Sequence, residues 1–344
     1  MDLPLWLMAI FAFIIINFML ISASVLVYAE RKVSGYMQNR PGPNRVGPFG
    51  FLQPFADVLK LIFKEDITPT ASNKFIHSLA PVLMVIIAMT VPGMIPFARG
   101  VVIVDNSVTV LLILALTSIS VYGVTLAGWS SNSKYSLLGG LRSAAQMISY
   151  ELSMGLAVVS VVLIAGSLSV VEIVENQASG MAILGWNIFC NPIGALIFII
   201  TAFAETNRAP FDLPEAEQEL VGGYHTEYSG MKFGMFFLAE YVNWFVASFV
   251  IVSLFFGGYL IPFEPLLLQA FPGLEGSVLL GLLQFASLMA KVSFFAFLFI
   301  WVRWTLPRFK YSQLMQICWK YLLPIALVNV LVIALGVALV KTLF

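Results

Sequence analysis

The chain has 344 residues, of which 60% are hydrophobic and only 10% are charged. Its formal net charge is zero, which argues against nucleic acid as a partner, because nucleic-acid-binding surfaces are strongly basic. This composition excludes an ordinary soluble domain and predicts an all-α polytopic membrane protein, with residues 1–344 forming a single membrane domain.

The sequence lacks the patterns that hold metals, haem or nucleotides. The two cysteines, Cys190 and Cys318, are isolated, and no Cys/His spacing is typical of zinc, iron–sulfur or haem ligation. Neither a P-loop nor a GxGxxG motif is present. We therefore expect this chain to bind no metal and no redox cofactor of its own.

Apolar runs long enough to cross a membrane, at about 20 residues per span, occur about eight times. They cover residues 4–29, 77–98, 107–129, 142–166, 183–205, 235–260, 277–303 and 318–341. The first run has no basic region before it and is longer than a signal-peptide core, so we expect a retained helix.

Basic residues are concentrated in alternate loops. The first, third, fifth and seventh loops hold most of them: Arg31, Lys32, Arg40, Arg45, Lys60, Lys64, Lys74, Lys134, Arg142, Arg208, Lys232, Arg303, Arg308, Lys310 and Lys320. By the positive-inside rule these loops face the cytoplasm, or the matrix of an organelle, and both termini face the other side. We expect the remaining loops to be plain connectors. Their charged residues are mainly the acids Glu172, Glu175, Glu264 and Glu275.

Residues 30–76 follow the first span and combine charged groups with a stiff turn. Glu30 and Arg31 lie at the inner membrane boundary, and the Pro/Gly-rich residues 39–50 present Arg40. Residues 51–65 have apolar side chains at helical spacing and predict an amphipathic helix at the membrane interface. Asp57 on this helix either pairs with Lys60 or faces a polar cavity beneath the helix.

An acidic loop over residues 205–235 separates the fifth and sixth spans. Asp212 and Glu215 fit a capping box, with Pro214 in the first turn, and predict a short helix that ends at Gly222. Close carboxylates that are poorly solvated share protons near neutral pH, although a solvated acidic loop is the plainer interpretation. The acids of this region that we consider functional are Glu205, Asp212, Glu215, Glu217, Glu219, Glu227 and, just beyond the loop, Glu240.

Two ionisable residues lie deep in apolar runs. Tyr150-Glu151 falls within the fourth span, where a carboxylate costs about 2.5–3.5 kcal/mol and is expected to face the interior of the bundle. Lys291 lies at a comparable depth in the seventh span and is the expected countercharge of Glu151. The pair is either a structural ion pair or a proton-carrying site.

Four long motifs, at residues 35–65, 127–151, 204–233 and 306–320, together resemble the family of NADH dehydrogenase subunit 1, which is called the H subunit in bacteria. This family belongs to respiratory complex I, the proton-pumping NADH:quinone oxidoreductase. The resemblance covers nearly the whole chain in the same order. It implies a protein that is inactive alone and forms the membrane side of a quinone chamber. It also implies hydrophilic-arm and membrane-arm subunits as partners, quinone as substrate, contact with lipid, and iron–sulfur clusters and FMN in partner subunits.

The resemblance also implies roles for individual residues. Chamber and entrance residues would be Glu30, Arg31, Arg40, Asp57, Arg208, Tyr150 and Tyr241. A relay of titratable groups that couples quinone reduction to proton translocation would be formed by Glu151, Glu205, Asp212, Glu215, Glu217, Glu219, Glu227, Glu240 and Lys291.

Two other functions stay open at this point. A membrane-bound hydrogenase contains a homologous membrane protein that does not use quinone, and a free-standing proton-coupled transporter would also carry intramembrane acids. Transporters often contain inverted repeats, and the two halves of this chain show no convincing repeat. We favour the bacterial inner membrane over the mitochondrial inner membrane as the location.

Overall fold

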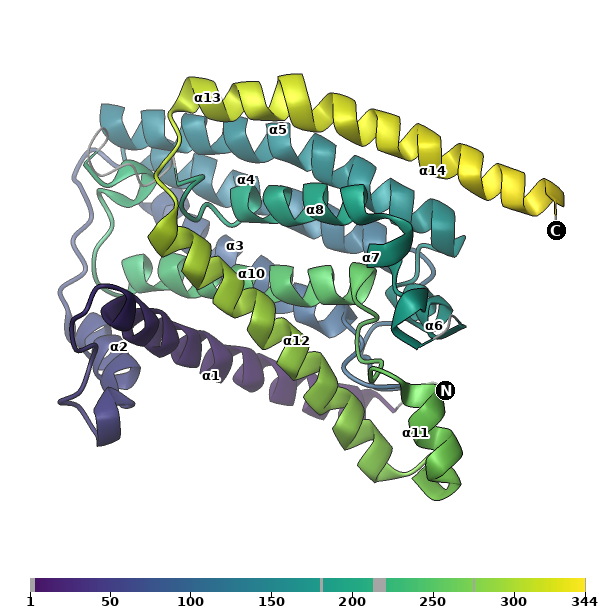
Figure 1. Cartoon of the computed structure of the whole chain (residues 1–344). Helices are drawn as coiled ribbons and strands as arrows, with labels where there is room; N and C mark the ends of the chain where they lie inside the picture. The colour runs from purple at the N-terminus through teal and green to yellow at the C-terminus, as the bar shows by residue number, and fades with distance from the viewer. Residues whose placement is uncertain (1–3, 180–181, 213–220, 275, 344) are drawn as a thin grey trace.

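The computed structural model describes residues 4–179, 182–212, 221–274 and 276–343. Long helices lie side by side as a bundle (Figure 1). The α-helices are α1 (Leu5–Met37), α2 (Gln53–Phe63), α3 (Lys74–Thr90), α4 (Thr109–Ser130), α5 (Lys134–Ala165), α6 (Val170–Asn176), α7 (Asn187–Cys190), α8 (Pro192–Glu205), α10 (Gly230–Phe255), α11 (Glu264–Ala270), α12 (Val278–Thr305), α13 (Tyr311–Gln316) and α14 (Leu323–Leu343).

Shorter helical turns connect these helices. The 3₁₀ turns are η1 (Pro48–Gly50), η2 (Val91–Met94), η3 (Gln177–Ser179), η4 (Ala182–Gly185), η5 (Gly223–His225) and η6 (Pro272–Leu274). The segment η7 (Ile317–Leu322) is π-helical and joins α13 to α14. Pro324 follows it and has no N–H to continue the regular hydrogen-bond pattern, which favours a wider turn at this point.

The prediction of an all-α polytopic membrane protein is confirmed. Within the described residues, seven helical stretches are long and apolar enough to cross a membrane. The prediction of a continuous fifth span over residues 183–205 is wrong. The helix α8 has 14 residues, which is about 21 Å at 1.5 Å per residue and shorter than the hydrocarbon core.

The break before α8 follows from its sequence. Pro192 cannot donate a backbone hydrogen bond, so α7 does not run on into α8. The side chain of Asn191 accepts from the backbone N–H of Gly194 at 2.9 Å and caps the new helix. Asn191 also donates to Ser160 Oγ at 2.6 Å, which anchors the break to α5.

Small residues let the central helices approach closely. A Cβ atom at Gly128 of α4 would lie 2.5 Å from the carbonyl oxygen of Ser136 in α5, and one at Gly140 would lie 3.2 Å from the carbonyl oxygen of Val124. Small residues of this kind drive packing in membranes, where burial of apolar surface contributes little between helices.

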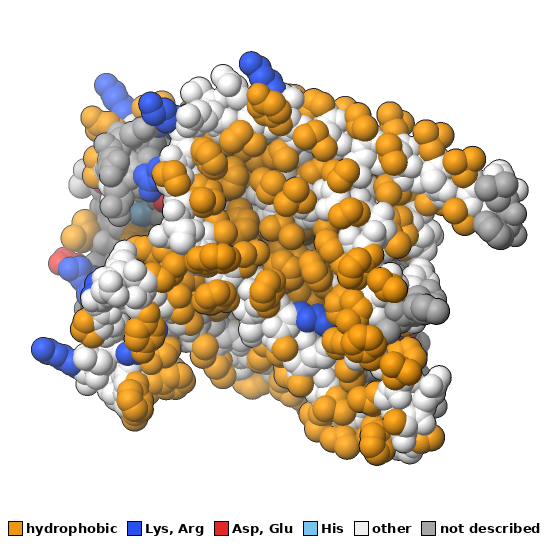
Figure 2. All heavy atoms as spheres, in the orientation of Figure 1, with side chains coloured by type: hydrophobic (Ala, Val, Ile, Leu, Met, Phe, Trp, Pro, Cys, Tyr) orange, Lys and Arg blue, Asp and Glu red, His pale blue; other side chains and the backbone are white. Residues whose placement is uncertain are grey.

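The loops predicted to face inside lie together at one end of the bundle. Figure 1 places α2, the start of α5 and α13 at the left, and both termini at the right. Most of the lysine and arginine side chains on the face shown in Figure 2 gather at the same left end. We call the left end the basic end and the right end the terminal end. The basic end is where the candidate site residues are concentrated.

Candidate functional site

A buried network of charged side chains lies at the basic end of the bundle. Glu30 of α1 is 4% exposed. Its carboxylate accepts from Arg208 Nη1 at 3.2 Å, from Arg303 Nη1 at 2.5 Å and from the hydroxyl of Tyr241 at 2.7 Å. Four separate segments of the chain therefore meet at one carboxylate.

Arg208 connects this carboxylate to a second one. Its Nε atom lies 3.5 Å from Oε1 of Glu240 in α10, and its guanidinium carbon lies 4.3 Å from the centre of the Tyr241 ring and 5.1 Å from that of Trp244. A planar guanidinium suits this position, because it bridges carboxylates and stacks on aromatic rings at the same time.

Asp212 forms a further pair next to the network. Its Oδ2 atom accepts from Arg308 Nη2 at 2.6 Å. Burial raises the pKa of Asp212 above its ordinary value, while Arg308 opposes this effect. The network defined by Glu30, Glu240, Asp212, Arg208, Arg303 and Arg308 thus has three carboxylates and three guanidiniums. The predicted capping box and the candidate acids Glu215, Glu217 and Glu219 lie outside the described residues.

A cavity of about 370 Å³ lies between α1, α2 and α10. Arg31 and Asp57 line it and form an ion pair with each other, so of the two alternatives for Asp57 the structure favours the one in which it faces a cavity over pairing with Lys60. Gln53 also donates to Asp57 at 3.0 Å. The other lining residues are Ala23, Ser24, Val27, Pro54, Val58, Lys60, Leu61, Phe233, Gly234, Phe237, Leu238 and Tyr241. Mostly apolar walls with a few charged groups are typical of small-molecule sites.

Tyr241 joins the cavity to the buried network. Its side chain lines the cavity, and its hydroxyl donates to Oε2 of Glu30. A group bound in the cavity is therefore separated from Glu30 and Arg208 by one aromatic side chain.

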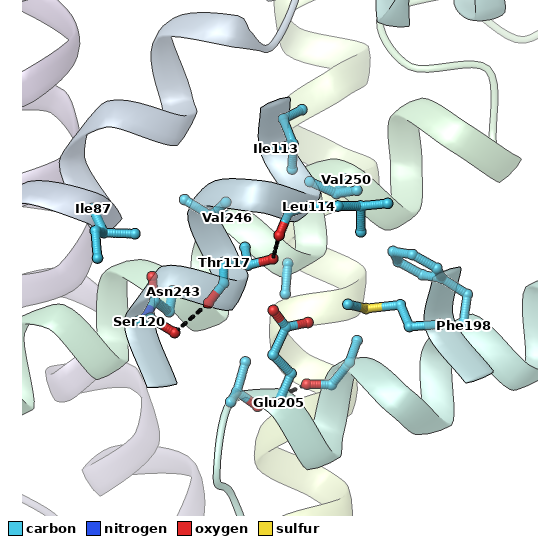
Figure 3. Close-up of a pocket in the computed structure, with 14 residues that line it drawn as sticks. Ile87, Ile113, Leu114, Thr117, Ser120, Phe198, Glu205, Asn243, Val246 and Val250 are labelled. Atoms are coloured by element: carbon cyan, nitrogen blue, oxygen red, sulfur yellow. Dashed lines mark hydrogen bonds between the residues drawn. The ribbon is translucent and has the colours of Figure 1, made fainter. Parts of the chain in front are cut away.

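A second, smaller cavity of about 50 Å³ lies deeper in the bundle, and Glu205 points into it (Figure 3). Thr117 and Ser120 of α4 and Asn243 of α10 supply polar groups, and the rest of the wall is largely apolar. This volume accommodates a few water molecules. Glu151 contacts the hydroxyl of Ser118 in α4, and its charge acts on Glu205.

The structure does not bring Lys291 to Glu151, so the predicted countercharge is wrong. Lys291 Nζ donates to the carbonyl oxygens of Phe256, Gly258 and Leu260 at 3.0, 3.0 and 2.6 Å. It also lies 4.4 Å from the centre of the Trp186 ring. These partners follow the end of α10, where free carbonyl groups attract a cation.

Three other predicted residues lie apart from the cavity beside α2. Arg40 is exposed and donates to Gln38 at 2.7 Å. Tyr150 is buried and donates to the carbonyl oxygen of Leu314 at 2.9 Å. Glu227 lies beside His77, on which its charge acts.

One acid in the loops that we expected to be plain connectors is buried. Glu264 is 6% exposed, accepts from Gln284 Nε2 at 3.1 Å and accepts from the backbone N–H of Ile261 at 3.1 Å. Glu264 is therefore a structural residue at the terminal end of the bundle.

Sequence reasoning missed the role of Arg303, which was counted only among the basic residues of the loops predicted to face inside. A count of charges among the expected buried residues could have indicated that a second cation was needed. Glu30 and Glu240 are two buried carboxylates, and Arg208 alone leaves one of them without a compensating cation.

Comparison with known proteins identifies a matching family model and close relatives of this chain. A family model described as NADH dehydrogenase matches residues 9–334. The chain is 79% identical over 339 residues to NADH-quinone oxidoreductase subunit 8 of Rhodothermus marinus, an alignment that covers 98% of this chain and 99% of the relative. It is 76% identical over 331 residues to the H subunit of NADH-quinone oxidoreductase from Salinibacter ruber, covering 96% of each.

A more distant relative carries the same subunit name. The H subunit of NADH-quinone oxidoreductase from Rhodospirillum centenum is 50% identical over 317 residues, covering 92% of this chain and 89% of the relative. The family model spans well over half of the chain, and the motifs named above fall within its range. The chain therefore belongs to the NADH dehydrogenase family.

Proposed function

We propose that this chain is the membrane subunit of a proton-translocating NADH:quinone oxidoreductase that forms the membrane side of the quinone chamber. The names of its relatives support the assembly, and the cavity between α1, α2 and α10 supports the chamber. The observation that carries the proposal is the position of Tyr241, which lines the cavity and donates to the buried carboxylate of Glu30.

The cavity has the chemistry that a quinone needs. Phe233, Phe237 and Leu238 offer apolar surface to the ring and tail of a quinone. The Arg31–Asp57 pair supplies charged groups at the same wall. Because α2 is amphipathic, it suits the membrane interface, from which a lipophilic substrate would enter.

The buried network then serves as the first part of a proton relay. Each electron that enters the quinone from a partner subunit changes the charge in the cavity until a proton follows it, and this change acts on Glu30 through Tyr241. Arg208 passes the change to Glu240, since it contacts both carboxylates. Glu205 and Glu151 lie deeper and continue the series of titratable groups towards the middle of the bundle.

The partners and location follow from the same proposal. The hydrophilic-arm subunits bind the basic end and hold the iron–sulfur clusters and FMN, and membrane-arm subunits bind the lipid-facing helices. The complex lies in a bacterial inner membrane, with the basic end towards the cytoplasm, as the distribution of lysine and arginine indicates. The related oxidoreductase subunits favour this function over the homologous hydrogenase protein and over a free-standing transporter.

Gly234→Leu in the purified complex tests the chamber. Gly234 lines the cavity, and a Cβ atom there would lie 2.9 Å from Cδ1 of Leu61, so a leucine fills space that the quinone needs. We expect the KM for a short-chain quinone to rise about 10-fold or more, while NADH oxidation by ferricyanide stays unchanged.

The matched control is Gly281→Leu in α12, where a Cβ atom would meet nothing within 4 Å. It should leave both activities unchanged. Wild-type quinone kinetics in an assembled Gly234→Leu complex would show that this cavity does not bind quinone.

A further inference from the structure

A buried glutamine on α5 holds the turn that carries Arg208. Gln146 is 0% exposed. Its Nε2 atom donates to the carbonyl oxygens of Ala204 and Phe211, both at 2.7 Å, and lies 3.4 Å from Oδ1 of Asn207. One amide group therefore joins the two ends of residues 204–211.

The orientation of this amide is fixed by its partners. Both close partners are carbonyl oxygens, which only accept, so the NH₂ end of Gln146 must face them and uses both of its hydrogens. No other uncharged side chain of similar length offers two donors from one atom. The geometry thus requires an amide at position 146.

Two neighbouring contacts also support residues 204–211, but neither joins the two ends of this turn as Gln146 does. The ring of Phe211 packs edge-on against that of Tyr150, one helical turn after Gln146, with 5.5 Å between centroids. The backbone N–H of Phe309 donates to the carbonyl oxygen of Pro210 at 3.2 Å. Both contacts lie at the Phe211 end of the turn, so Gln146 alone among these three residues ties the Ala204 end to the Phe211 end.

Arg208 lies at the middle of this turn and is 4% exposed. Its partners, Glu30 and Glu240, belong to α1 and α10, so they do not follow the turn if it moves. A displacement of the turn by about 1 Å would lengthen the 3.2 Å hydrogen bond to Glu30 beyond good hydrogen-bonding distance and would weaken the 3.5 Å ion pair with Glu240.

We infer that Gln146 is a positioning residue for Arg208 and thereby sets the charge balance between Glu30 and Glu240 during quinone reduction. This inference rests on the function proposed above. Gln146 touches neither the cavity beside α2 nor the carboxylates, and it acts through the backbone of residues 204–211.

Gln146→Met in the purified complex tests the inference, because methionine preserves the length and removes both donors. We expect NADH oxidation by ferricyanide to be unchanged and the kcat for quinone reduction to fall about 10-fold. The KM for quinone should stay near its wild-type value, since the cavity is intact. The pH–activity profile should shift by roughly half a unit, because the position of Arg208 affects how the carboxylates bind protons.

Gln177→Met is a demanding control. Gln177 is 2% exposed, donates to the carbonyl oxygens of Ile173 and Ser253, and accepts from the N–H groups of Asn187 and Gly257. It bridges backbone segments as Gln146 does, but it lies at the terminal end of the bundle. Its loss should lower thermal stability and leave the pH–activity profile unchanged.

The inference is overturned if Gln146→Met keeps the wild-type kcat and pH profile, or if Gln177→Met changes them equally. If Gln146→Met does not assemble, Gln146→Asn is measured instead. Its shorter amide reaches one carbonyl at most, and a wild-type profile in that variant also overturns the inference. A failed inference with a raised quinone KM in Gly234→Leu leaves the chamber standing, whereas unchanged quinone kinetics in Gly234→Leu refutes the chamber itself.

Discussion

The hydroxyl of Tyr241 donates a hydrogen bond to Oε2 of Glu30 at 2.7 Å, although the two residues are 211 positions apart in the chain. This bond connects the wall of the cavity beside α2 to the buried network. If a quinone reacts in that cavity, the bond is a direct route by which the reaction can affect the network.

Removing this bond should separate binding from turnover. We expect Tyr241→Phe to lower the kcat for quinone reduction by about 10-fold or more, since a positioned hydroxyl is lost while the ring remains. Steady-state kinetics of the purified complex measure this effect. Tyr122→Phe on the exposed face of α4 is the control and should behave as wild type. An unchanged kcat for Tyr241→Phe would exclude the hydroxyl from the relay.

The loss of Arg208 should destabilise the complex. Arg208→Met leaves Glu30 and Glu240 with fewer cations in a buried site, which we expect to cost about 3–5 kcal/mol. Glu240→Gln in the same chain removes one of the unpaired charges and should recover part of the loss. Thermal unfolding of the single and double variants measures this coupling, and strictly additive effects would contradict it.

Glu151 should be needed for coupling and not for assembly. We expect Glu151→Gln to assemble normally, because glutamine can keep the contact with Ser118, and to lower proton-coupled quinone reduction. Proton uptake per NADH in reconstituted vesicles is the measurement, with Glu172→Gln in α6 as the control. Full activity and full pumping would leave Glu151 with a structural role.

Lys291 should stabilise the fold without affecting quinone binding. Lys291→Met removes a charged donor from three carbonyl groups, and we expect a cost of about 2–3 kcal/mol in unfolding free energy. The quinone KM should stay unchanged. A variant that keeps wild-type stability but loses proton pumping would instead return Lys291 to the relay.

His225 should make stability depend on pH. Its ring packs edge-on against those of Phe233 and Phe237, which line the cavity beside α2, and burial lowers the pKa of His225 to about 4. The ordinary value is 6.5, so the folded protein binds the proton less well than the unfolded chain does. This contribution to stability is complete above pH 6.5 and is lost as the pH falls towards 4.

We expect the thermal unfolding temperature to fall between pH 7.5 and pH 5, and to fall less in His225→Phe, which keeps an aromatic ring in the same place. Equal slopes for the wild type and the variant would show that the ring of His225 is protonated as readily in the folded protein as in the unfolded chain.

The sequence indicated the fold class, most of the spans and the amphipathic helix α2, because hydrophobic length and helical spacing are local properties. The family resemblance also indicated Glu30 and Arg208 as chamber residues and Glu240 as a relay residue. It did not indicate which charges pair. Arg303 meets Glu30 across 273 positions, and Lys291 meets backbone carbonyls and not Glu151. Such partners depend on how the helices are arranged in space. The carbonyl groups that bind Lys291 are free because α10 ends before them, and residue composition does not reveal this.

The meeting of four segments at Glu30 also has a consequence for biosynthesis. Glu30 is made 178 residues before Arg208 and 273 residues before Arg303. At about 5–20 residues per second, the ribosome needs tens of seconds to supply both arginines. Glu30 therefore has neither guanidinium as a partner until Arg208 is made, and it lacks Arg303 until the end of α12 is made. Completion of the network is therefore a late step, which takes place only after α12 has been inserted.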